Sequence, residues 1–152
     1  MKNTEELPQK LKNKAKVLLE NLLSTRKALT SFHWRQFLPV KSWRPRLPFE
    51  RYQEFIKSQG EMSRELQREC HSASLKLKDV NKSFVLCLKD YAFALENSFN
   101  SLEGVRETRE WRDEQDPRFT LKEFKNSIVT HQKDVDKLFD EAKKLNEIWL
   151  KM

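Results

Sequence analysis

The sequence has very little glycine and almost no sign of β-strands. Only two glycines and five prolines occur among 152 residues, whereas a sheet protein needs frequent turn residues between short strands. Charged residues make up 35% of the chain and hydrophobic residues 38%, which is typical of helices that bury an apolar stripe beneath a charged surface. We expect an all-α fold, and a chain of this length suits a single helical domain, 1–152.

Long apolar runs and cysteines are also scarce. No stretch approaches the roughly 20 apolar residues that a membrane-spanning helix needs, and the first residues, MKNTEE, lack the apolar region of a signal peptide. An intracellular protein, cytoplasmic or nuclear, is therefore expected. Cys70 and Cys87 both fall on a helical apolar stripe, which predicts buried, reduced thiols in place of a disulfide.

Motifs that identify an enzyme or a cofactor site are missing too. The chain has no glycine-rich phosphate loop and no nucleophile elbow. Its three histidines are isolated and lack the spacing of metal ligands. We therefore expect no cofactor, no metal and no enzymatic activity. His131 lies on the apolar seam of the last helical stretch, where a core or rim histidine with one hydrogen bond is expected.

What the sequence does contain is a helical repeat of apolar residues in three separate stretches. In the last stretch, 120–151, Thr120 and Glu123 form a capping-box pattern, and Phe119 and Phe124 flank it as a hydrophobic staple. Apolar positions then alternate at spacings of three and four, as in coiled coils. These seam positions are Leu121, Phe124, Ile128, His131, Val135, Leu138, Ala142, Leu145, Trp149 and Met152.

A first helix is expected over about 5–33, with the same alternation. Its seam consists of Leu11, Ala15, Leu18, Leu22, Thr25, Leu29 and Phe32. Val17, Leu19 and Leu23 widen the apolar stripe, which predicts contact with more than one neighbouring helix. Pro8 is compatible with this helix, because a proline in a first turn removes a hydrogen-bond donor that has no partner there anyway.

The middle stretch, 49–112, leaves the topology open. It contains no proline, and its seam keeps the same phase through Phe49, Tyr52, Ile56, Gln59, Ser63, Leu66, Cys70, Ala73, Leu77, Val80, Phe84, Cys87, Tyr91 and Ala94. One helix of about 60 residues, about 90 Å long, would give an elongated three-helix rod. A reversal near 79–83 would give a four-helix bundle instead. We favour the rod, because a turn has no evident reason to preserve phase and turn glycines are missing.

Positive charge is concentrated in the N-terminal third. Residues 7–49 carry ten cations and one acid, Glu20, within a chain of net charge +7. The proline-rich linker 34–48 mixes aromatic and cationic side chains, which suits a cap on the bundle, a protein surface, or contact with nucleic acid or anionic lipid. The candidate partner-binding residues are Trp34, Arg35, Phe37, Lys41, Trp43, Arg44 and Arg46.

Four lysines of the first helix follow one another at intervals of two residues. Lys10, Lys12, Lys14 and Lys16 therefore alternate between two sides of the helix and do not form one basic stripe. A role in nucleic-acid binding would require the fold to bring them together with the linker arginines.

Three functions are compatible with these features. The leading one is a non-enzymatic adaptor or assembly subunit, whose coiled-coil-like faces bind a protein partner or form a homo-oligomer. Polar seam residues favour it, because such residues often determine register and partner choice; they are Gln59, Ser63, Ser98 and Ser101. The alternative is a nucleic-acid-binding protein that uses the basic N-terminal third and the linker.

The third function depends on one pair of residues. Arg64 and His71, separated by six residues, resemble in spacing the Arg-to-His motif of HEPN ribonucleases, which are small helical bundles. The resemblance covers these two residues only. Glu65, directly after the arginine, departs from the residue usual in that family. The resemblance implies cleavage of RNA as a remote alternative.

Overall fold

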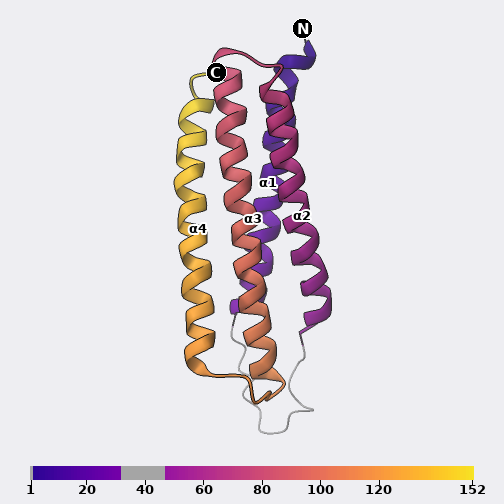
Figure 1. Ribbon diagram of the computed structural model, residues 1–152, viewed down its shortest axis with the longest axis vertical. Helices are drawn as coiled ribbons and strands as arrows, with labels where there is room; N and C mark the ends of the chain where they lie inside the picture. Colours follow the sequence, from indigo (N-terminus) through magenta and orange to yellow (C-terminus); the bar gives the residue numbers. More distant parts are fainter. Residues whose placement is uncertain (1, 32–46) are drawn as a thin grey trace.

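The computed structural model describes residues 2–31 and 47–152, with side chains from residue 6 onward. The described residues form four helices and no strands: α1 (Lys2–Thr30), α2 (Phe49–Ser74), α3 (Asp79–Asp113) and α4 (Leu121–Trp149). Figure 1 shows that α4, α3 and α2 lie side by side and that α1 lies behind α3 and α2. The expected all-α class is confirmed.

Helix α3 is the centre of the molecule. It contacts each of the other three helices, and its buried side chains are distributed around most of its circumference. They include Phe84, Val85, Leu88, Tyr91, Ala92, Leu95, Phe99, Leu102 and Val105. Helix α3 thus buries apolar surface on several sides. This burial is the main contribution to the stability of the fold.

The expected unbroken helix over 49–112 is wrong, and with it the three-helix path of the chain. Helix α2 ends at Ser74, and the chain reverses over 75–78, just before the range in which the alternative placed the turn. Consecutive helices therefore run in opposite directions, and both chain termini lie at the end of the molecule that contains this turn (Figure 1).

Two physical reasons explain why the sequence wrongly favoured an unbroken helix over 49–112. The turn has no glycine, but Asp79 adopts a left-handed conformation with φ of 57°, which aspartate tolerates better than most residues. The seam phase also continues through the turn, because Leu77 is itself buried there. Since α3 is buried around most of its circumference, nearly any phase would match one of its buried stripes, so continuity of phase did not indicate one helix.

The other helices agree closely with the sequence. Thr120 caps α4, and its Oγ1 accepts a hydrogen bond of 3.1 Å from the backbone N–H of Glu123. The rings of Phe119 and Phe124 lie 6.1 Å apart, as a hydrophobic staple requires. Helix α1 ends at Thr30, three residues earlier than expected. Its last carbonyl groups are bound by the buried side chain of Arg109.

Candidate functional site

The partner-binding residues expected from the sequence all lie outside the described residues. These are Trp34, Arg35, Phe37, Lys41, Trp43, Arg44 and Arg46, within the segment 32–46. The structure does describe the lysines of α1. Lys14 forms an ion pair of 2.7 Å with Glu69 of α2, and the Nζ of Lys12 lies 3.8 Å from the ring centroid of Trp149 of α4. The alternating lysines therefore contact helices on opposite sides of α1, as their spacing predicted.

The apolar seams of the helices are largely buried against other helices of the same chain. In α1 the seam residues from Leu11 to Leu29 are all buried, and in α4 the buried seam includes Phe124, Val135 and Leu138. The polar seam residues also have internal partners: the hydroxyls of Ser63 and Ser98 donate to backbone carbonyls four residues earlier. Most seam surface of the described residues is therefore closed to a partner, although Leu121 and Met152 of the α4 seam are exposed.

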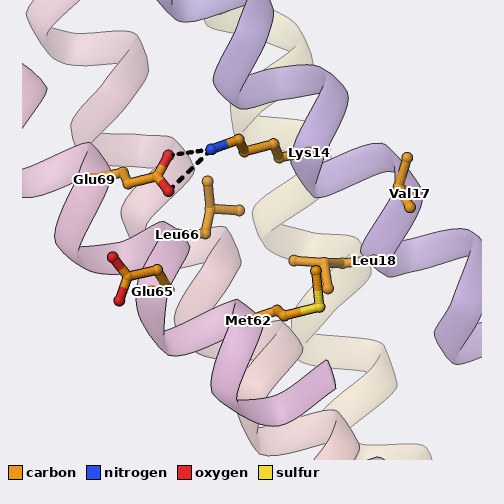
Figure 2. A pocket seen from close by; sticks show the side chains of 7 residues that line it. All are labelled: Lys14, Val17, Leu18, Met62, Glu65, Leu66 and Glu69. Atoms are coloured by element: carbon orange, nitrogen blue, oxygen red, sulfur yellow. Dashed lines mark hydrogen bonds and ion pairs between the residues drawn. The ribbon is translucent and has the colours of Figure 1, made fainter. Parts of the chain in front are cut away.

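A surface that is open to a partner lies at the junction of α1 and α2. A groove with a volume of about 260 Å³ runs between the two helices (Figure 2). Its lining residues are Lys14, Val17, Leu18, Met62, Glu65, Leu66 and Glu69. Most of this lining is apolar. Two of its apolar side chains remain half exposed: Val17 at 53% and Met62 at 52%. Apolar side chains exposed together in a groove commonly mark an interaction site.

Polar contacts define the two ends of the groove. At one end the ammonium group of Lys14 crosses from α1 to the carboxylate of Glu69 (Figure 2). At the other end the amide of Asn21 donates a hydrogen bond of 2.9 Å to the side-chain oxygen of Gln59. Between them the buried side chains of Leu18 and Leu66 form the floor. These contacts hold α1 and α2 in a defined register, so the groove is preformed.

The apolar surface extends beyond the groove along α2. Phe55 is 37% exposed and precedes Met62 by seven residues, or two helical turns, so both lie on the same side of α2. With Val17 of α1, these side chains form an apolar strip along the junction of the two helices. We call Val17, Phe55 and Met62 the apolar strip.

The two walls of the groove differ in charge. The α1 wall carries Lys14, whereas the α2 wall carries Glu65 and Glu69. Among the described residues, the one ion pair of Glu65 is an exposed contact of 3.2 Å with Arg68, one turn further along α2. The walls therefore present positive and negative charge on opposite sides of an apolar floor.

Sequence reasoning did not identify this groove. It recognised that Val17 widens the apolar stripe of α1, but Met62 lies off the seam of α2 and gave no signal by itself. The groove exists because Lys14 and Asn21 of α1 pair with Glu69 and Gln59 of α2. These pairings join residues that are far apart in the sequence.

The Arg64 and His71 pair is placed on α2, on one side of the helix as its spacing requires. The Nε of Arg64 donates a hydrogen bond of 2.8 Å to Glu96 of α3, so its guanidinium group is engaged in an ion pair between the two helices. His71 is exposed in the last turn of α2.

Other chemically reactive side chains are buried. His131 is 1% exposed, its Nδ1 lies 3.0 Å from the hydroxyl of Ser101, and burial lowers its pKa to about 4. Burial raises the pKa of Cys70 to about 12, so this thiol stays protonated. Within 2–31 and 47–152, no group of three or more histidine, cysteine or acidic side chains is arranged to hold a metal ion.

Comparison with known proteins adds no functional information. No protein-family model, curated protein or solved structure matches the chain. Among the described residues, none of the helices is both long enough and apolar enough to span a bilayer.

Proposed function

We propose that this protein is a non-enzymatic helical interaction module that binds a partner protein along the groove between α1 and α2. The observation that supports this most directly is the half-exposed apolar strip of Val17, Phe55 and Met62. It borders a preformed groove, and most seam residues in the described part of the chain are buried. Helices commonly bind helical partners in this way, with apolar side chains of the partner inserted between two parallel ridges.

The geometry of the groove favours a helical partner over an extended one. An extended strand binds by adding to the edge of a sheet, and the described residues offer no sheet edge. A helix instead needs an apolar furrow that follows the helix direction, and the junction of α1 and α2 provides one between Lys14 and Asn21. Because Val17 and Met62 are already about half buried, covering the rest of each side chain would contribute about 1 kcal/mol.

A pair of aspartate substitutions tests the proposal. Val17→Asp and Met62→Asp each place a charge on the apolar strip, and both should abolish co-purification of a specific partner from cells that express the tagged chain. The control is Val129→Asp on α4, because Val129 is 52% exposed and nearly matches Val17 in chemistry and exposure. The proposal fails if every recovered partner survives both groove variants, or if Val129→Asp removes the same partners.

A second proposal, binding of nucleic acid by the basic N-terminal third, is supported by the excess of cations over residues 7–49. Affinity should then decrease steeply with salt, because each phosphate contact releases counterions. It should decrease again when Arg44 and Arg46 are replaced by glutamate. Retention on a polyanion column no stronger than that of an unrelated protein of equal net charge would refute this proposal.

A further inference from the structure

The contacts between α1 and α2 determine which residues lie at the same level along the molecule. Lys14 pairs with Glu69, and Asn21 pairs with Gln59. Val17 lies midway between Lys14 and Asn21 on α1, and Met62 lies between Gln59 and Glu69 on α2. Because both line the same short groove, Val17 and Met62 are within about one helical turn of the same level on neighbouring antiparallel helices.

This arrangement is self-complementary under a twofold axis that is parallel to the helices. Rotation about such an axis preserves height along the molecule and places α1 of one copy opposite α2 of the other. Val17 of each copy would then face Met62 of the second copy. The interface would be isologous, with each pair of contacts made twice, as in most homodimers.

The charges of the two walls follow the same symmetry. Lys14 on the α1 wall would lie opposite the acidic wall of α2, with Glu65 and Glu69. Lys14 and Glu69 already pair within one chain, so two copies would bring four alternating charges together. An unrelated partner would need an apolar stripe with acids along one edge and a cation along the other. A second copy of this chain has such an apolar stripe, with acids along its α2 edge and a cation along its α1 edge.

We propose that the occupant of the groove is a second copy of this chain, held by the apolar strip and the oppositely charged walls of both copies. This inference rests on the proposed function, because it assigns the partner of the same groove. The interface would be apolar at its centre and charged at its rim, which is the usual distribution in protein interfaces.

Light scattering coupled to size-exclusion chromatography tests the stoichiometry. The wild-type chain should elute with the mass of two chains, and Val17→Asp or Met62→Asp should shift it to the mass of one. Val129→Asp should leave the dimer intact. Circular dichroism must show unchanged helix content in all three variants. A wild-type monomer over the full concentration range, or a dimer that survives both groove variants, would overturn the inference.

Crosslinking tests the orientation of the two copies. Val17→Cys and Met62→Cys are made separately, each with Cys87→Ser because Cys87 is half-buried and Cys70 is fully buried. Treatment with a short bismaleimide should give severalfold more crosslinked dimer from a mixture of the two variants than from either alone. Efficient crosslinking of the Val17→Cys variant by itself would mean that α1 faces α1, and the proposed axis would be wrong.

The outcomes also separate this inference from the proposed function. A monomeric chain that loses a different partner protein on Val17→Asp and Met62→Asp would overturn the second copy as the occupant while the proposed function stands. A chain that is monomeric and has no groove-dependent partner would overturn both.

Discussion

Arg109 is a cationic side chain placed where the bundle is otherwise closed to water. It is 1% exposed, and its Nη1 donates hydrogen bonds to the carbonyl groups of Ala28 and Leu29 at the end of α1. Its Nε lies 3.8 Å from a carboxylate oxygen of Asp113. Within the described part of the chain, Nε and Nη2 have no hydrogen-bond partner, and burial lowers the pKa of the guanidinium. Arg109 thus joins α1 to α3 at a cost in desolvation.

Replacement of Arg109 measures the balance of these two effects. Arg109→Ala leaves two helix-terminal carbonyl groups without a donor and opens a cavity, so it should lower the free energy of unfolding by about 3 kcal/mol. Arg109→Met retains most of the packing and removes the buried charge, so it should cost less than Arg109→Ala. Urea denaturation measures both. Arg68→Ala, at a side chain that is 69% exposed, is the control and should cost less than about 0.5 kcal/mol; an equal loss in both alanine variants would contradict the prediction.

His131 makes stability depend on pH. Burial first, and then the charge of Arg26, lower its pKa from 6.5 to about 4 in the folded chain. Between these values the unfolded chain binds more protons than the folded chain, so stability is greatest above pH 6.5 and decreases as pH falls toward 4. The total loss should be about 3 kcal/mol at most.

The variant His131→Leu isolates this contribution. The difference in unfolding free energy between wild type and variant should change over that pH interval and become constant on either side of it. Chemical denaturation at a series of pH values provides the measurement. A difference that does not vary with pH would show that His131 titrates normally in the folded state.

At the level of the element, the end of α3 is a Schellman motif built without glycine. The backbone N–H of Asp116 bonds to the carbonyl of Trp111 at 2.8 Å, and that of Gln115 bonds to the carbonyl of Arg112 at 3.2 Å. Gln115 has φ of 56°, a left-handed conformation that usually belongs to glycine at this position. Its side chain therefore imposes a conformational cost.

Glycine at this position should remove the cost. We expect Gln115→Gly to raise the free energy of unfolding by about 0.5 to 1 kcal/mol, measured as a higher urea midpoint with an unchanged slope. Lys143→Gly, at an exposed position inside α4, is the matched control and should destabilise by about 1 kcal/mol. If both glycine substitutions destabilise equally, Gln115 is not strained.

At the scale of the element, the sequence predicts some features of the fold and not others. Helix α4 was predictable because Thr120 caps it and the apolar repeat follows at once. The turn before α3 was only the less favoured alternative, because Asp79 adopts the conformation that a glycine would have signalled. The groove could not be derived either, since Val17 and Met62 come together only through the register of α1 on α2. Local chemistry determines helices, whereas their pairing is a tertiary property.

At the scale of the whole molecule, the reversal between α2 and α3 determines how far apart two exposed acids lie. Glu54 lies near the start of α2 and Glu107 near the end of α3, and these two helix ends lie at the same end of the molecule (Figure 1). An unbroken helix would separate the two residues by about 80 Å. The folded-back arrangement should bring them within about 30 Å, since adjacent helix axes are about 8 to 10 Å apart.

Spin labels at Glu54→Cys and Glu107→Cys, made together with Cys87→Ser because Cys87 is only half-buried, measure this separation directly. Dilution of the doubly labelled chain into an excess of unlabelled wild type removes distances between copies, so that only the separation within one chain contributes. One short distance is expected, because Ala73 of α2 and Phe84 of α3 are both buried and hold the two sides of the turn against the core. A single long distance under the same dilution would mean that the chain straightens at 75–78 in solution. The groove between α1 and α2 could still form in that case, because its contacts lie within those two helices.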